Sequence, residues 1–222
     1  MTASRASAII LVVRAPGWKQ VVTVSTVSRS GGHEIRWHGR GGQGAVTSAK
    51  LLADAAFRSG WTGITSAPTF GAERRGAPVT ASTRLSCEPI RVFSQVNAPD
   101  ITVVLDESLI EVGGAASGLQ PGGVAVVNTT RTADELSFPP GTRVFAADVT
   151  GAAQAAGVVV GGVPIVSAAI LGSVAKATGV VDMDGVAEAI ASMFPPSAAE
   201  KNLQAARIAY DCTAEGGTPD AG

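Results

Sequence analysis

Four glycines within seven residues mark the segment of this sequence with the clearest chemical potential. They lie in HGRGGQGAVTSAK, residues 38–50, where a helix-forming pattern follows directly. Glycine permits left-handed backbone and lets a ligand approach the main chain, and the unpaired N–H groups at a helix start attract anions. A phosphate or diphosphate would suit such a loop. The candidate binding residues are Gly39, Gly41, Gly42, Gln43 and Gly44.

Three interpretations of this loop remain open. Gly39, Gly41 and Gly44 fit the G-x-G-x-x-G pattern of dinucleotide-binding proteins. Such a site also needs an acidic residue about 20 positions further on, at the end of the second strand. The corresponding segment GITSAP, residues 63–68, contains no Asp or Glu, so a complete NAD site is the least supported interpretation. A phosphate contact and a purely structural role in packing the helix on the sheet are the other two.

A second unusual segment is APTFGAERRGAP, residues 67–78, in which Glu73, Arg74 and Arg75 stand together between prolines. Neighbouring arginines can hold a carboxylate or phosphate with paired hydrogen bonds. Charged residues make up only 16% of the chain, so this triplet favours contact with a ligand or a subunit interface. Arg74 and Arg75 therefore join the candidate site. A solvated charged turn is the alternative.

Groups that could carry out catalysis are sparse. His33 and His38 are the only histidines, and His38, directly before the glycine loop, is expected to have a structural role. Asp106 follows an apolar run and is expected to cap the next turn.

Cys87 and Cys212 form no CxxC pattern and are predicted to be buried free thiols. A zinc site or iron–sulfur cluster held by this chain alone is excluded by that spacing. The chain does not look like a self-sufficient enzyme.

The order of the helices and strands expected around these residues predicts an α/β fold. Its expected form is a three-layer sandwich, with a mostly parallel mixed sheet that begins in a glycine-rich strand-loop-helix unit. Continuous apolar runs such as residues 101–105 are typical of strands buried on both faces. The expected strands are 34–38, 61–66, 79–85, 90–93, 101–105, 124–127 and 143–147. The expected helices are 44–59, 164–178, one that begins at Asp182 or Asp184, and one that begins at Ser197.

Composition limits the domain organisation and the partners. The net charge is −1, which gives no basic surface for nucleic acid. No apolar run reaches the ~18 residues that a membrane span needs. Residues 1–33 contain basic but no acidic side chains and are expected to be an extension that is poorly ordered or resembles a targeting segment. Residues 34–212 are predicted to form one domain, and residues 213–222 a flexible tail.

The two loops together resemble a known family. GRGGQGAVTSAKLLADAA followed by FGAERRGAPVTASTRL is similar to the gamma subunit of pyruvate and 2-oxoisovalerate:ferredoxin oxidoreductases. The similarity continues through APDITVVLD, residues 98–106, and VPIVSAAILGSVAKATG, residues 163–179. It ends in EKNLQAA, residues 200–206, and covers about residues 34–212.

The resemblance implies a role in a complex rather than activity alone. Such complexes oxidatively decarboxylate pyruvate or a branched-chain 2-oxoacid to acyl-CoA and CO2 and reduce ferredoxin. Thiamine diphosphate, Mg and 4Fe-4S clusters are expected on the partner alpha, beta and delta chains, and coenzyme A is the co-substrate. A cytoplasmic location is expected, with no nucleic-acid or membrane partner. The competing hypotheses are a free-standing nucleotide-binding oxidoreductase and an adaptor domain, both of which would use the glycine loop.

Overall fold

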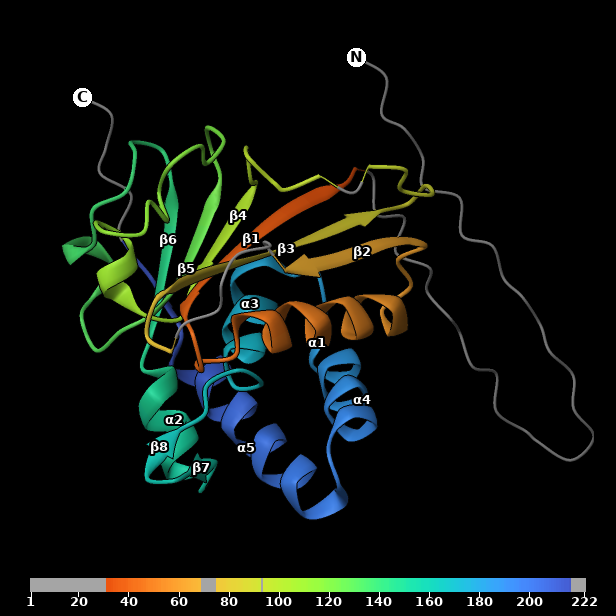
Figure 1. Cartoon of the computed structure of the whole chain (residues 1–222), viewed down its shortest axis with the longest axis vertical. Coiled ribbons are helices and arrows are strands. Elements are labelled where there is room, and N and C mark those ends of the chain that lie inside the picture. The colour runs from red at the N-terminus through yellow and green to blue at the C-terminus, as the bar shows by residue number, and fades with distance from the viewer. Residues whose placement is uncertain (1–30, 69–74, 93, 217–222) are drawn as a thin grey trace, which may run out of the picture. The chain divides into compact units, whose positions relative to one another are not determined.

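A seven-stranded sheet organises the chain (Figure 1). The computed structural model describes residues 31–68, 75–92 and 94–216. The strands are β1 His33–Arg40, β2 Gly63–Pro68, β3 Pro78–Ser86, β4 Ile101–Val104, β5 Val124–Asn128, β6 Arg143–Ala147, β7 Val159–Val160, β8 Val163–Pro164 and β9 Ala214–Glu215. The helices are α1 Ala45–Arg58, α2 Val149–Ala155, α3 Ile170–Thr178, α4 Met183–Met193 and α5 Pro196–Cys212, with short 3-10 helices η1 Glu107–Leu109 and η2 Ala133–Glu135.

The sheet has the strand order β2-β3-β1-β4-β5-β6-β9, and β7 and β8 form a separate hairpin. Strands β1, β4, β5 and β6 are parallel neighbours. Strand β3 is antiparallel to both β1 and β2, and β9 is antiparallel to β6. The predicted mixed, mostly parallel α/β sheet is therefore confirmed.

Alternation along the strands separates the two faces of the sheet. In β1, Ile35 and Trp37 are fully buried in the core that all five helices share, whereas Arg36 and His38 point to the opposite face. On that opposite face a smaller apolar cluster lies under the segments that carry η1 and η2. The sheet thus lies between a helical layer and a layer of loops with 3-10 helices.

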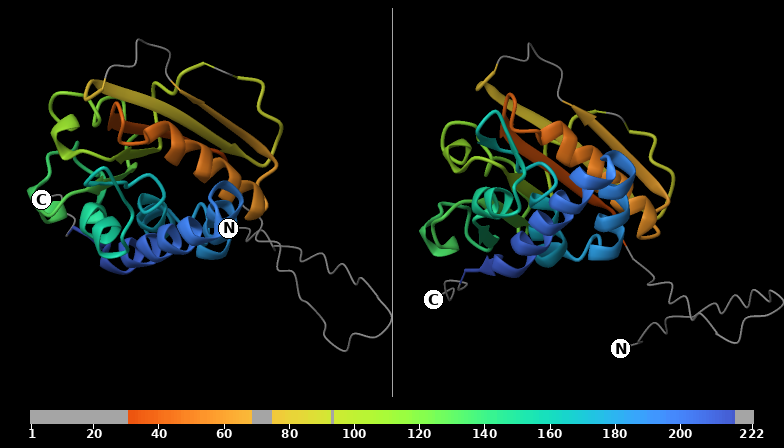
Figure 2. Two further views of the ribbon diagram at one scale, coloured as in Figure 1. Left: turned by 60° about the horizontal axis from the view of Figure 1, so that its bottom comes forward. Right: turned by 90° about the horizontal axis from the view of Figure 1, so that it is seen from below.

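The helical layer has two tiers. Helix α1 packs on β1, β2 and β3, and α3 packs on β5 and β6, while α4 and α5 pack against those two helices. Figure 2 shows α1 directly beneath the sheet, with α5 further from it. Gly172 allows α3 and α5 to pack closely, because a Cβ at this position would lie 1.8 Å from the backbone oxygen of Ala206 in α5.

Three expectations about the elements were wrong. Residues 90–92 form no strand. Both edges of β3 are already paired, one with β1 and the other with β2, so no further strand can join it. Phe93 lies outside the described residues. The helix expected from residue 164 begins at Ile170, because Pro164 pairs with Val159 in the β7–β8 hairpin. Residues 214–215 of the expected tail form β9 beside β6. Residues 1–30 lie outside the described residues.

Candidate functional site

The glycine loop connects the end of β1 to the start of α1. Gly42 and Gly44 have left-handed backbone, with φ of +97° and +86°, whereas Gly39 and Gly41 do not. Gly44 occupies the N-cap position of α1 without a side-chain cap. A Cβ on Gly44 would lie 2.7 Å from the Cβ of Ser167, in the segment before α3. Glycine is therefore required here both by the backbone conformation and by the contact.

Gly39 serves the packing of strand against helix. Its added Cβ would lie 3.1 Å from the Cβ of Ala45 and 3.7 Å from the Cβ of Leu105. Gly42 differs, because an added Cβ there would meet nothing within 4 Å. The open side of the loop is thus at Gly42, and its packed side is at Gly39 and Gly44.

Gln43 ties the loop to β4, the neighbouring parallel strand. Its side-chain oxygen accepts a hydrogen bond from the backbone N–H of Arg40 at 2.7 Å. Its side-chain nitrogen donates to Oδ2 of Asp106 at 3.0 Å. Both ends of the Gln43 amide are therefore used inside the protein, where they hold the loop against the end of β4.

Asp106 and Arg40 form an ion pair at the same place. Arg40 Nε lies 3.0 Å from Asp106 Oδ2, and Arg40 also donates to Ser108 Oγ at 2.6 Å and to the backbone oxygen of Gly76 at 3.1 Å. Burial alone would raise the pKa of Asp106, but hydrogen bonds from Ser108 and Gln43, together with the Arg40 charge, hold this pKa below its ordinary value. Asp106 also accepts from the backbone N–H of Ser108, so the predicted cap is confirmed.

The structure joins the two loops that the sequence singled out. The backbone N–H of Gly41 donates to the oxygen of Ala77 at 2.8 Å, and the N–H of Gly76 donates to the oxygen of Gly41 at 3.0 Å. Gly41 and Arg75 form an isolated parallel bridge, and the Arg75 side chain is exposed. Arg74 and Glu73 lie outside the described residues. Arg75 is thus the candidate arginine that the structure brings to the glycine loop.

The paired loops lie at a switch point of the sheet. Strands β1 and β4 are parallel neighbours and end at the same edge, with His38 opposite Val104. The chain leaves β1 into α1 on the helical face, whereas it leaves β4 into η1 on the other face. In α/β proteins ligands bind outside the carboxyl ends of strands where successive connections diverge in this way. This position, rather than any one residue, makes the loop a candidate site.

His38 is buried beside the loop, with 3% of its surface exposed. Its Nε2 accepts a hydrogen bond from Nε of Arg36 at 2.9 Å. Burial, together with the adjacent Arg36 charge, lowers the pKa of His38 to about 4. A neutral imidazole that accepts from a guanidinium supports the structural role predicted for this residue.

The cysteines depart from expectation. Within the described residues neither Cys87 nor Cys212 forms a disulfide, and both are exposed rather than buried. Cys87 follows the end of β3, and Cys212 is the last residue of α5. Within the described residues no group of three or more His, Cys, Asp or Glu side chains is placed to hold a metal ion. The same part of the chain has no helix that is long and apolar enough to span a membrane.

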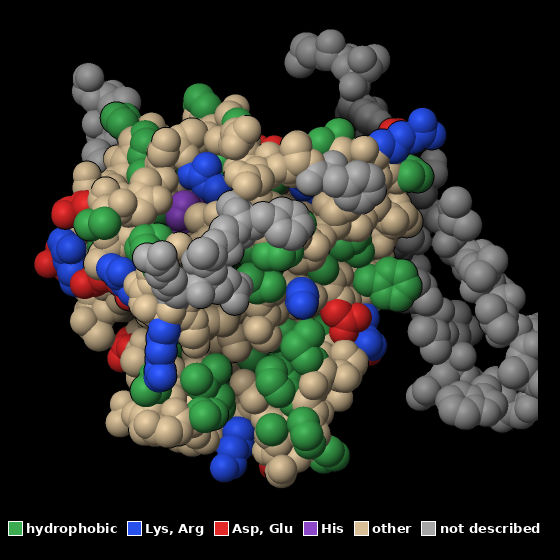
Figure 3. All heavy atoms as spheres, viewed as in Figure 1, with side chains coloured by type: hydrophobic (Ala, Val, Ile, Leu, Met, Phe, Trp, Pro, Cys, Tyr) green, Lys and Arg blue, Asp and Glu red, His purple; other side chains and the backbone are tan. Residues whose placement is uncertain are grey.

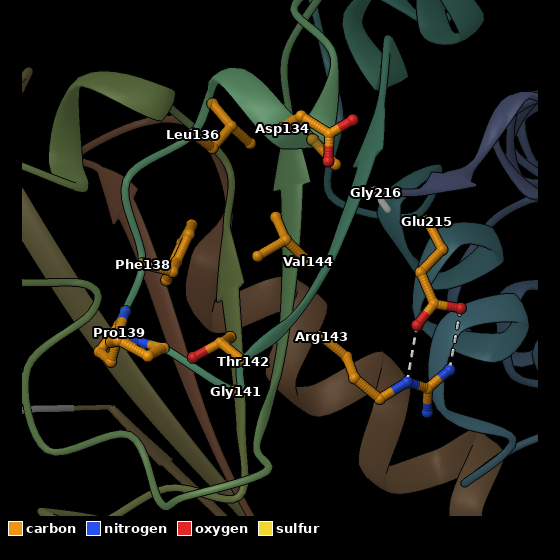
Figure 4. Close-up of a pocket in the computed structure, with 12 residues that line it drawn as sticks. Asp134, Leu136, Phe138, Pro139, Gly141, Thr142, Arg143, Val144, Glu215 and Gly216 are labelled. Atoms are coloured by element: carbon orange, nitrogen blue, oxygen red, sulfur yellow. Dashed lines mark hydrogen bonds and ion pairs between the residues drawn. The ribbon is translucent and has the colours of Figure 1, made fainter. Parts of the chain in front are cut away.

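A separate hollow lies between η2, β6 and β9 (Figure 4). Phe138 and Val144 line it, and Arg143 pairs with Glu215 at its side through bonds of 2.7 and 3.1 Å. Its volume of about 170 Å³ is small beside the ~300 Å³ or more of ligand pockets. It lies near the start of β6, at the opposite edge from the glycine loop. It is therefore a weaker candidate than the switch point.

Sequence comparison connects this geometry to a family. The family described as "Pyruvate ferredoxin/flavodoxin oxidoreductase" matches residues 34–212. The chain belongs to this family. The predicted resemblance is confirmed, and the matched range contains both loops, the Arg40–Asp106 pair and, apart from His33 at the start of β1, every strand of the sheet except β9.

Individual relatives match this chain over nearly their whole length. A pyruvate/ketoisovalerate oxidoreductase common subunit gamma from Thermococcus kodakarensis is 47% identical over 184 residues, which cover 81% of this chain and 96% of the relative. The pyruvate synthase subunit PorC of Methanothermobacter marburgensis is 46% identical over 178 residues, covering 80% and 96%. A crystal structure of pyruvate oxidoreductase subunit PORC from Thermotoga maritima superposes with a TM-score of 0.70 at 30% identity, covering 83% and 98%. The chain therefore corresponds to the gamma subunit.

Sequence reasoning missed the Arg40–Asp106 pair. A signal for it exists, because residues of opposite charge lie at or just after the ends of two strands that become parallel neighbours. Recognising that signal requires knowing that β1 and β4 are adjacent, although residues 41–100 separate them in the sequence.

Proposed function

We propose that this chain acts as the gamma subunit of a 2-oxoacid:ferredoxin oxidoreductase complex. The complex converts pyruvate or a branched-chain 2-oxoacid, together with coenzyme A, to acyl-CoA and CO2, and passes the electrons to ferredoxin. The observation that carries the proposal is the family match over residues 34–212, which contains both characteristic loops. The expected partners are alpha, beta and delta chains in the cytoplasm, a reducing environment that suits two cysteines that form no disulfide among the described residues.

The redox and decarboxylation cofactors are assigned to the partner chains. Iron–sulfur clusters are held by sets of cysteine thiolates, and this chain has two cysteines, one just after β3 and the other at the end of α5. Its described residues therefore do not fit a cluster, and neither the decarboxylation on thiamine diphosphate nor the electron transfer is assigned to this chain.

The role proposed for this chain is to present the paired loops to coenzyme A or to the chain that binds it. Within the described residues, the backbone N–H groups of Gly42 and Gly44 donate to no protein acceptor. Together with the first-turn N–H groups of α1 they could receive a phosphate. Arg75 would add a charge from the second loop, and Arg74 is proposed with it. Gly39, Gly41 and Gln43 would act indirectly, because their packing and hydrogen bonds fix the loop.

The arrangement of β2 disfavours the alternative of a free-standing dinucleotide-binding enzyme. In that architecture the second strand lies parallel beside the first and ends in the acid that binds ribose. Here β2 lies at the sheet edge, separated from β1 by β3, and it ends in Pro68. In the part of the chain that the structure describes, β2 ends without such an acid and does not lie beside β1.

Reconstitution tests the proposed function. The alpha, beta and delta chains are produced with and without this chain, and 2-oxoacid-dependent reduction of ferredoxin is measured as coenzyme A is varied. We expect turnover to require this chain, and the isolated chain to be inactive. Equal turnover in its absence, or turnover by the chain alone, would contradict the proposal.

Variants of the loops then separate a ligand role from a structural one. Arg75→Ala is expected to raise the KM for coenzyme A at least threefold if the side chain contacts its phosphates, with assembly unchanged. A weaker assembly with an unchanged KM would instead place Arg75 at a subunit interface. Arg91→Ala is the matched control, because Arg91 is an exposed arginine beyond the end of β3, at the opposite edge of the sheet. Arg75 variants that assemble and turn over like the control would leave the second loop as a solvated turn.

A further inference from the structure

The β7–β8 hairpin carries apolar side chains into solvent. Val160 pairs with Val163 across a turn made by Gly161 and Gly162, which both have left-handed backbone. Val160 and Val163 are 70% and 54% exposed, and Val159 is 42% exposed. Of the seven large apolar side chains exposed in the described part of the chain, three come from this hairpin. A concentration of this kind in so short a segment marks an interaction site rather than ordinary surface.

A groove of about 370 Å³ adjoins the hairpin. It lies where the end of α2 and the hairpin meet the start of α5. Its lining residues are Gly157, Val158, Val159, Val160, Ile165, Phe194, Ser197, Ala198, Lys201 and Asn202. Figure 1 places β7 and β8 beside α2 and α5, and Figure 3 shows hydrophobic side chains over the lower part of the same face. The groove and the exposed valines thus form one apolar surface, which we call the hairpin groove.

Lys201 gives this surface a charge preference. It is the only ionisable side chain in the groove lining, and it forms no ion pair among the described residues. The side-chain nitrogen of the neighbouring Asn202 donates to the backbone oxygen of Ala198 at 2.9 Å and is already engaged. An apolar groove with one unneutralised cation is complementary to a large apolar side chain that adjoins a carboxylate.

We propose that the hairpin groove is the docking surface for a segment of a partner subunit in which a large apolar side chain adjoins an Asp or Glu. This inference rests on the proposed function, which supplies the partner chains. A small carboxylic acid is a poorer occupant, because Val163 lies outside the groove lining and would stay exposed. A second copy of this chain also fits less well. A symmetric contact presents the same patch from both chains, so two Lys201 side chains would face each other with no acid in either groove.

Two pairs of variants test the surface in the assembled complex. Val160→Ser with Val163→Ser is compared with Val112→Ser, which alters a valine that is 76% exposed elsewhere on the molecule. Lys201→Glu is compared with Lys201→Arg, which keeps the charge. Each chain is co-expressed with its partners, and its dissociation constant is measured by titration, with thermal melting as the check on folding. The hairpin double variant and Lys201→Glu should each bind roughly tenfold more weakly or worse, whereas both controls should bind as the wild type does.

Carbodiimide coupling, which joins a lysine amine to a carboxylate in contact with it, then identifies the occupant. We expect Lys201 to be coupled to a partner peptide whose Asp or Glu adjoins a large apolar residue, and Lys201→Arg to assemble without that product. If the wild type assembles and the groove variants assemble equally well, the docking proposal is overturned while the proposed function stands. A cross-link between two copies of this chain would also overturn it. A wild-type chain that binds none of the partners would overturn the proposed function, and this inference with it.

Discussion

At the scale of single residues, His38 links stability to pH. The unfolded chain binds a proton at histidine near pH 6.5, whereas burial and Arg36 lower the pKa of the folded His38 to about 4. Between these values the unfolded state binds more protons, so the free energy of unfolding falls as the pH drops from 6.5 to 4. The total loss is on the order of 3 kcal/mol.

Urea unfolding between pH 7 and pH 4.5 measures this slope. His38→Gln keeps an acceptor for Arg36 without a titrating group, so its stability should depend less on pH over that range. Carboxylates contribute equally to both chains and cancel in the comparison. Parallel pH slopes for the two proteins would show that His38 is not the group responsible, and an NMR titration of its imidazole in the folded protein gives the pKa directly.

At the scale of elements, the junction of the glycine loop and α1 can be tested by two glycines with similar backbone. Gly42 and Gly44 both have positive φ, but only Gly44 meets a neighbour, Ser167. Alanine at either position should cost about 1–3 kcal/mol of stability from backbone strain, and Gly44→Ala should cost more because its Cβ overlaps Ser167. Chemical denaturation measures the free energy of unfolding of both variants. It is repeated for the double variant Gly44→Ala with Ser167→Gly, in which the overlap is removed. Equal losses for the two single variants would mean that the segment carrying Ser167 moves away from the added Cβ at no cost in stability.

The sequence predicted the elements whose signals are local. The apolar runs of β4, β5 and β6 and the glycine stop of α3 at Gly179 needed no tertiary information. The β7–β8 hairpin was missed although Gly161–Gly162 between valines is a hairpin signal, because Pro164 also suits a helix start. The false strand at 90–93 and the Arg40–Asp106 pair depended on which strands are neighbours, and a single sequence does not determine that.

At the scale of the whole molecule, the part of the chain that folds is expected to begin near Gly32. Among the described residues, the buried apolar core lies between Ile35 and Ala209, and contacts group residues 32–222 as one unit. A chain that starts at Gly32 should melt within a few degrees of the full chain, as calorimetry can show. A loss of several kcal/mol would instead mean that residues 1–31 bury one or two large apolar side chains against this unit.

The central position of β1 has a consequence for synthesis of the protein on the ribosome. Ile35 pairs with Ile101, 66 residues further along the chain, and Trp37 pairs with Ala81 on the other side. At about 5–20 residues per second, roughly 3–13 s pass between the synthesis of β1 and that of its parallel neighbour β4. During this interval β1, which carries two large core side chains, can pair with β3 on one side but has no parallel neighbour on the other. The nascent chain should therefore need protection from aggregation until residue 104 has left the exit tunnel, and slower translation would lengthen that need.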